Sequence, residues 1–279
     1  FSHVSDTKTP QGILLVMKQR SCEICEMLDL DAQGRKPLLM VLDNLQDLNV
    51  TDVFYKGKLV DRNAPIRVKT CGRALKHTVH LDKVKAEQFV LPIGKKKTHV
   101  IGINPSQITT EDLAVSLQPA ANYVPTDGYS KVAAVERHHN TGKIGVTVAK
   151  GYGIRNGAVA SSVSHDSHNI IVIGDNDRDM ALAVDEIIRT QGGYTVVENG
   201  EVFETLPLPI MGLMSDAGFE SVNETLGRMI KKAHEMGVPA DIEPFITLSF
   251  LALPVIPTLR ITPRGLCLLT AKGPEILQE

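Results

Sequence analysis

The residues with the clearest chemical potential in this chain lie between positions 161 and 169. This run contains serines, an asparagine, an aspartate and two histidines, and imidazoles can bind metals or move protons as well as hydrogen-bond. It stands directly before the apolar stretch 170–174, whose composition predicts a buried strand. Because a sheet holds the groups at its edge rigidly, we expect a functional site here. Its candidate residues are His165, Asp166, His168 and Asn169.

A second polar group follows the apolar run 131–135 and contains Glu136, Arg137 and His138. If the two strands are neighbours, both polar groups meet at one edge of the sheet. Three interpretations stay open: a site around a bound substrate, a structural hydrogen-bond network, or a metal site. Extended backbone would point His165 and His168 to opposite faces, whereas a turn would let them converge. Residues 136–139 can also be an exposed, charged strand end.

Other short motifs point to local structure more than to chemistry. Cys22 and Cys25 form one C-x-x-C pair without a second pair nearby, so incidental thiols are favoured over a zinc or redox centre. The acidic run 175–179 has the alternation of a calcium loop but lacks its Gly and terminal Glu. It opens a helix, so capping is the favoured interpretation.

The elements that must position these residues predict an α+β fold. We expect a small β unit at 37–62 and a mixed α/β domain at 63–279, with residues 1–36 unassigned. Amphipathic helices should cover the sheet, one over residues 180–191 and one beginning at Ser221, where Glu224 completes a capping-box pattern. The predicted strands of the larger domain are 77–81, 99–103, 131–135, 144–149, 158–163, 170–173 and 194–197.

Composition argues against several classes of function. The chain has 30 Lys and Arg against 32 Asp and Glu, so we expect no nucleic-acid partner. Its apolar runs are too short for a membrane span. Four cysteines do not form a disulfide framework, which favours a cytoplasmic location. The first residues show neither a starter Met nor a signal peptide, and we expect the chain to be part of a longer protein.

Long ordered stretches of this sequence resemble one family. Residues 136–142 and 157–169 are similar to the C-terminal domain of bacterial adenine deaminase, and the similarity covers about residues 37 to 269. The polar residues named above belong to these stretches. Further stretches that carry the resemblance are 41–45, 56–60, 174–180, 191–193, 206–213 and 244–257.

The resemblance implies a member of the amidohydrolase superfamily that hydrolyses adenine to hypoxanthine and ammonia in purine salvage. It also implies a homo-oligomer and a divalent metal, manganese or iron, at the mouth of a (β/α)₈ barrel. Such a metal activates the attacking water. The barrel requires about 250 residues, and no H-x-H motif occurs in this chain. We therefore expect the metal mainly in a barrel that this chain lacks.

The resemblance also implies roles for individual residues. Asp6, in a segment similar to the end of the barrel, is the one candidate for a metal-binding, proton-shuttling carboxylate. The seven residues of the two polar groups would orient the purine or close the site against water, without binding the metal. A rival hypothesis makes them an assembly interface in an amidohydrolase that acts on a related base. These seven are Glu136, Arg137, His138, His165, Asp166, His168 and Asn169.

Overall fold

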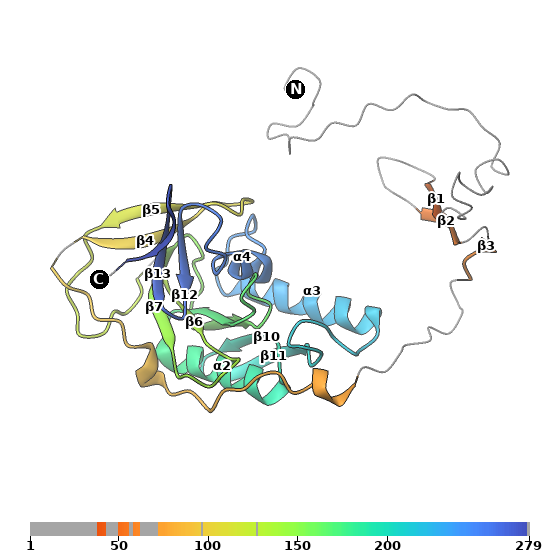
Figure 1. Cartoon of the computed structure of the whole chain (residues 1–279), viewed down its shortest axis with the longest axis horizontal. Helices are drawn as coiled ribbons and strands as arrows, with labels where there is room; N and C mark the ends of the chain where they lie inside the picture. Colours follow the sequence, from red (N-terminus) through yellow and green to blue (C-terminus); the bar gives the residue numbers. More distant parts are fainter. Residues whose placement is uncertain are drawn as a thin grey trace, which may run out of the picture. The chain divides into compact units, whose positions relative to one another are not determined.

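The computed structural model describes residues 38–42, 50–55, 58–61, 72–95, 97–126 and 128–277. It divides the chain into two compact units, Phe1–Lys69 and Thr70–Glu279, coloured along the sequence in Figure 1. The predicted domain boundary at 62–63 lies outside the described residues, as do Asp6, Cys22 and Cys25. The division into domains at that boundary stays a prediction.

The first unit contains a three-stranded antiparallel sheet in the order β1–β2–β3. Its residues are mostly β-branched, aromatic or leucine, which suit a pleated surface. A small β unit was predicted in this region, and these strands lie within it. The strands are β1 (Leu38–Leu42), β2 (Val50–Tyr55) and β3 (Lys58–Leu59).

The second unit is built on an eight-stranded sheet in the order β11–β10–β8–β9–β6–β7–β4–β5. All neighbours pair antiparallel except β4 and β7, which run parallel. The central strands β8 and β9 are buried along their whole length, which explains their continuous apolar sequence. The strands are β4 (Thr98–Ile103), β5 (Thr110–Val115), β6 (Tyr129–Val135), β7 (Ile144–Lys150), β8 (Gly157–Ser161), β9 (Ile170–Gly174), β10 (Gly193–Glu198) and β11 (Glu201–Pro207).

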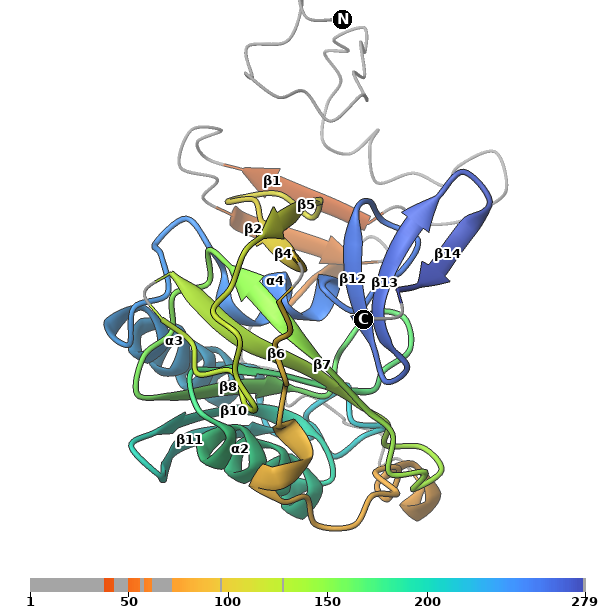
Figure 2. The ribbon, with the colours of Figure 1, turned by 90° about the vertical axis from the view of Figure 1, so that its left-hand side faces the viewer.

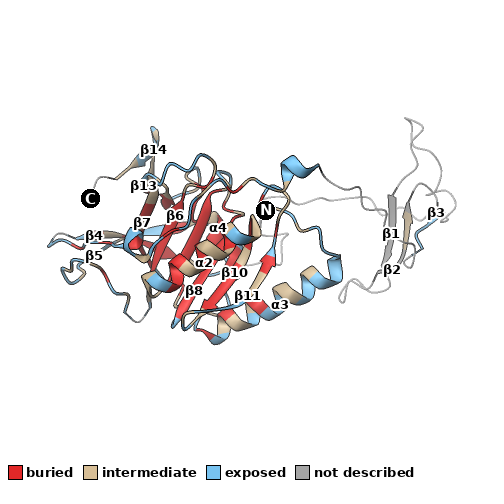
Figure 3. Cartoon of the chain, turned by 90° about the horizontal axis from the view of Figure 1, so that it is seen from below, coloured by how far each residue is buried: buried red, intermediate tan, exposed pale blue. Residues whose placement is uncertain are grey.

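Both faces of this sheet are covered, as Figures 2 and 3 show. Ala133 and Val135 pack in a core with helix α2, whereas Val132 and Ala134 pack in another core with α3 and α4. This alternation is the two-residue period of a strand buried on both sides. The predicted α+β fold with helices on sheets is confirmed. The covering elements are η2 (Ala86–Phe89) and α2 (Asp177–Thr190) on one face, and α3 (Phe219–Glu235), α4 (Pro244–Phe250), β12 (Leu259–Thr262), β13 (Gly265–Thr270) and β14 (Gly273–Ile276) on the other.

Of the two predicted helix starts, that of α2 is confirmed and that of α3 is wrong. Asn176 caps α2, since its side chain accepts a hydrogen bond from the backbone N–H of Asp179, as the capping interpretation predicted. The predicted capping box at Ser221 is wrong. Helix α3 begins at Phe219 with Gly218 as N-cap and no side-chain capping hydrogen bond, so the Ser221 and Glu224 pattern lies inside the helix and does not mark its start. In the part of the chain that the structure describes, no helix is long and apolar enough to cross a bilayer.

The strand predicted at 77–81 is also wrong, since this segment has irregular structure. It follows the short helix η1 (Arg73–Leu75) and is held by single contacts instead of a ladder. The backbone N–H of His80 donates to the Arg137 carbonyl, and that of Val79 donates to the Gln191 side chain. Its apolar residues are therefore explained by packing on α2 and the sheet and not by strand pairing.

Candidate functional site

The two polar groups lie together at one edge of the sheet. Strands β6 and β9 pair antiparallel with Val135 opposite Ile170, so the residues after β6 meet the residues before β9. The backbone N–H of Arg137 donates to the side-chain oxygen of Asn169 at 3.3 Å. We call residues 136–139 and 161–169 together the polar edge.

Arg137 holds the polar edge from inside the protein. Its side chain is 1% exposed, and its guanidinium donates to the carbonyl oxygens of Thr78, His168 and Met211. No carboxylate pairs with it among the described residues, and burial lowers the pKa of the guanidinium to about 10. The arginine therefore acts as a charged clasp that joins four segments, and its side chain is closed to a ligand in solution.

The segment 210–214 is fastened to the same edge by a second buried group. Ser162 Oγ donates to the Gly212 carbonyl at 2.6 Å and accepts the Gly193 N–H at 2.9 Å. Gly212 has a φ of 72°, and a Cβ there would lie 2.8 Å from the guanidinium nitrogens of Arg137. Only glycine fits so close to the arginine. Neither Ser162 nor Gly212 was predicted as a site residue, because their roles depend on contacts that form only in the folded chain.

Glu136 organises the turn between β6 and β7. Its carboxylate accepts the backbone N–H groups of His138, His139 and Thr141 at 2.6, 2.9 and 3.0 Å, together with the Thr141 hydroxyl. Desolvation would raise the pKa of this carboxyl, but these hydrogen bonds outweigh it and lower the pKa to about 2. Glu136 is therefore an ionised turn anchor, which is a role that sequence reasoning did not assign.

The histidines of the polar edge differ in whether their ring nitrogens are already hydrogen-bonded within the protein. His138 Nε2 donates to the Ser167 carbonyl at 2.8 Å, and His168 Nδ1 donates to the Val163 carbonyl at 3.0 Å. His165 instead stacks on Phe250 with ring centroids 5.0 Å apart and lies 3.2 Å from an Asp166 oxygen. The His165 and Asp166 side chains are 40% and 79% exposed. Among the seven predicted site residues they are the pair most open to a ligand.

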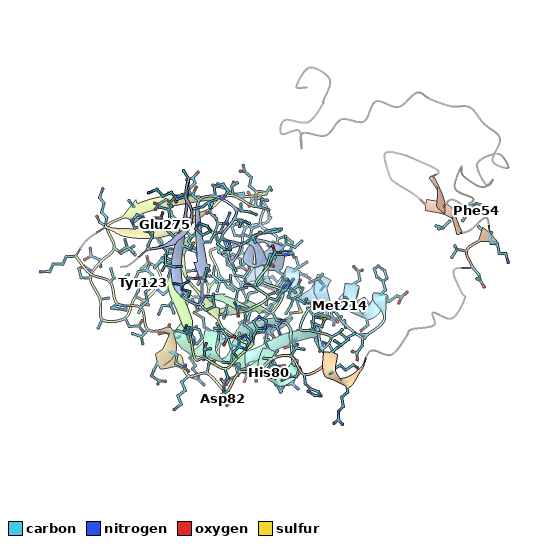
Figure 4. The ribbon with its side chains drawn as sticks, viewed as in Figure 1. Phe54, His80, Asp82, Tyr123, Met214 and Glu275 are labelled. Atoms are coloured by element: carbon cyan, nitrogen blue, oxygen red, sulfur yellow. The ribbon has the colours of Figure 1, made fainter. Side chains whose placement is uncertain are left out.

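A small cavity lies beside the Glu136 turn. Its volume is about 280 Å³, and its lining includes Asp82, Thr141 and Ile144. Asp82 and Asn140 exchange two hydrogen bonds of 3.1 and 2.8 Å at its rim. Figure 4 labels His80 and Asp82 on the segment that carries this rim. The polar groups here satisfy one another, which makes the cavity a poor ligand site.

The described residues do not fit a metal centre. Among them, no three His, Cys, Asp or Glu side chains are grouped so as to hold a metal ion. The ring centroids of His165 and His168 are 6.2 Å apart, and one nitrogen of His168 is already committed to a carbonyl. The chemistry that remains to this edge is hydrogen bonding, stacking and exclusion of water.

Fold and site together define an α+β domain with a rigid polar edge. The family model described as adenine deaminase C-terminal domain matches residues 107–272. The adenine deaminase of Desulfitobacterium hafniense (strain Y51) is 48% identical over 237 residues, covering 84% of this chain and 42% of that protein. The chain belongs to the adenine deaminase C-terminal domain family.

Other relatives give the same extent of similarity. The adenine deaminase of Nitratidesulfovibrio vulgaris (strain DP4) is 44% identical over 241 residues, which is 84% of this chain and 42% of the relative. That of Clostridium acetobutylicum is 38% identical over 253 residues, which is 88% of this chain and 44% of the relative. The chain thus spans about two fifths of the length of the curated relatives it matches.

Proposed function

We propose that the protein of which this chain forms a part hydrolyses adenine to hypoxanthine and ammonia in purine salvage. The observation that carries the proposal is the 48% identity over 84% of the chain to a protein named adenine deaminase. The family match at 107–272 includes all of the polar edge. The proposal extends to a homo-oligomer in the cytoplasm, a location supported by the cysteine content, since four cysteines are few for a disulfide framework in a chain of 279 residues.

Manganese or iron belongs to the same proposal, held mainly by a part of the protein that this chain does not span. When bound, such a metal supplies activation of the attacking water. The described residues offer it no ligand set, and Asp6, which lies outside them, stays the one candidate carboxylate of this chain.

The polar edge has two tasks in this proposal. His165 and Asp166 are the accessible pair, and they would contact the purine or close its site against water. Arg137, His168 and Asn169 hold that pair in place through the contacts described above. A stacked imidazole and phenyl ring also suit a flat heterocycle. Glu136 and His138 keep the neighbouring turn in register with them.

The first experiment measures adenine turnover by this chain with added manganese, with bound metal quantified on the same sample. No turnover and no metal would agree with a domain that needs the rest of the protein. Turnover with stoichiometric metal would overturn the assignment of the metal to another part. The histidines would then become the first ligand candidates.

The second experiment uses His165→Ala in the intact enzyme. We expect turnover to fall with metal content near normal, and an equal loss of metal would refute the assignment. His99→Ala is the matched control, because His99 also pairs with an aspartate, Asp112, at 2.8 Å and has 41% exposure. Particle size distinguishes the rival hypothesis: dissociation of the His165 variant with proportional loss of activity would support an assembly interface.

A further inference from the structure

Four large apolar side chains are exposed beside the polar edge. Leu75, Met211, Met214 and Phe219 are 41%, 44%, 53% and 75% exposed, and we call them the methionine surface. The Met211 N–H donates to the Leu75 carbonyl at 2.7 Å, and Met214 forms a β-bridge with Ile210. Figure 4 labels Met214, and Phe219 follows it along the chain as the first residue of α3. The four residues therefore come from adjoining segments.

The methionine surface stands on a rigid base. The Met211 carbonyl accepts from Arg137, and the next carbonyl, that of Gly212, accepts from Ser162. Met211 has left-handed backbone with a φ of 58°, which a residue with a Cβ rarely adopts, so its environment fixes this conformation. Gly212, with a φ of 72°, adopts the same region by its own preference. The Arg137 guanidinium thus contacts both this turn and the polar edge. A partner on this surface would border the turn that Arg137 fastens to the polar edge.

The rim of the surface carries an ion pair. Lys76 and Asp216 lie on the two segments that carry Leu75 and Met214, and they pair with each other at 2.5 Å. The four large side chains that a partner would contact are apolar. Methionine side chains adapt readily to such partners, and contiguous apolar exposure marks interaction surfaces.

We propose that the methionine surface is the docking surface for the part of the polypeptide that this chain does not span in its relatives. The inference rests on the proposed function only in taking this chain as one part of such a protein. This chain matches 42% of the Desulfitobacterium relative, so more than half of that protein has no counterpart here. Docking on this surface sets the polar edge against the rest of the protein, which is where the proposed function requires it.

The test co-expresses this chain, carrying a tag, with the portion of the Desulfitobacterium protein that it does not span. We expect that portion to co-purify with the wild-type chain, and Met214→Glu to reduce its recovery at least tenfold. Val255→Glu is the matched control, because Val255 is 64% exposed and follows α4, on a loop outside the methionine surface. Equal recovery with both variants would overturn the proposal. The two variants should have the same melting temperature, which shows that both are folded.

A second measurement does not depend on the other portion folding alone. The two portions are joined in one polypeptide, and peroxide oxidation of Met211 and Met214 is followed by mass spectrometry. We expect both to oxidise at least fivefold more slowly than in this chain by itself, and equal rates would refute the proposal. If the chain alone sediments as a dimer that Met214→Glu dissociates, a second copy is the occupant and the proposal is wrong. None of these readouts needs adenine turnover, so failure of the proposed activity is detected separately.

Discussion

Two buried arginines fasten two regions of this domain, and neither has a carboxylate partner among the described residues. Arg137 is 1% exposed and Arg260 is 0% exposed. Burial lowers the pKa of each guanidinium to about 10, because desolvation disfavours the charged form. Both stay charged at neutral pH and donate to carbonyl oxygens, and Arg137 also donates to the Thr78 hydroxyl at 3.4 Å.

The acceptors of the two guanidinium groups differ. Arg260 donates to Ile256 and Pro257, four and three residues before it, and to Ile108 across the fold. Its Nη1 has no acceptor among the described residues. Most of its contacts thus close a local loop.

Arg137 instead joins segments that are distant in the sequence. Its acceptors on Thr78, His168 and Met211 are 59, 31 and 74 residues away. The same buried cation is therefore a local loop anchor in one region and a long-range clasp in the other. Each guanidinium donates to three carbonyl oxygens, so the distance of the acceptors along the sequence, and not their number, distinguishes what the two arginines stabilise.

The largest effect should come from Arg137→Met, which keeps an apolar side chain of similar length but removes every donor. It leaves three carbonyls from distant segments without a partner, so we expect the free energy of unfolding to fall by about 3 kcal/mol. Denaturant titration followed by circular dichroism measures this loss. A loss below that of Arg260→Met would contradict the comparison.

Gly212→Ala should come next, at about 2 kcal/mol of destabilisation. The new Cβ would lie 2.8 Å from the Arg137 guanidinium at a φ of 72°, so the clasp must shift. Gly227→Ala in α3 is the control, because a Cβ there meets nothing within 4 Å. That control should stabilise the helix by about 0.5–1 kcal/mol. Thermal unfolding of the Gly212→Ala and Gly227→Ala variants measures both effects. A Gly212→Ala variant as stable as the wild type would show that the Arg137 guanidinium is not fixed beside Gly212.

Arg260→Met should cost less, about 1–2 kcal/mol. It removes hydrogen bonds that mostly close one loop, and it also removes a buried cation with one unsatisfied nitrogen, which offsets part of the loss. The same denaturant titration applies. If its cost equals that of Arg137→Met, the reach of the acceptors is irrelevant and the comparison fails.

The smallest effect is expected for Glu136→Gln, in the turn next to Arg137. The pKa of Glu136 is lowered from 4.5 to about 2. The ionised carboxylate therefore contributes fully to the free energy of unfolding above pH 4.5, and this contribution is lost as the pH falls toward 2. The group is partly solvated, so we expect only about 1 kcal/mol at pH 7. Unfolding titrations of wild type and variant between pH 7 and 2 measure the difference, which should shrink with acidification. A constant difference would assign the effect to packing.

Local sequence patterns were good predictors wherever the structure depends on neighbours along the chain. The apolar runs before 136 and after 169 predicted β6 and β9, and the run 175–179 predicted the start of α2. The pattern failed for residues 77–81, whose hydrophobic residues pack without forming a strand. It also gave no sign of β11, an edge strand whose first three residues are exposed, because edge strands lack the buried alternation that reveals a strand.

The sequence by itself determined the central strands, the main helices, the polar character of 136–139 and 161–169, and the resemblance to a family. Each of these depends on residue type, short spacing or ordered identity. Only the tertiary structure decided that Arg137 is a clasp and that His165 and Asp166 stay accessible. Hydrogen bonds over 59 or 74 residues leave no periodic trace. They form only when the sheet brings its strand ends to one edge. Burial then makes an unpaired carbonyl costly in free energy, so each buried acceptor needs a donor.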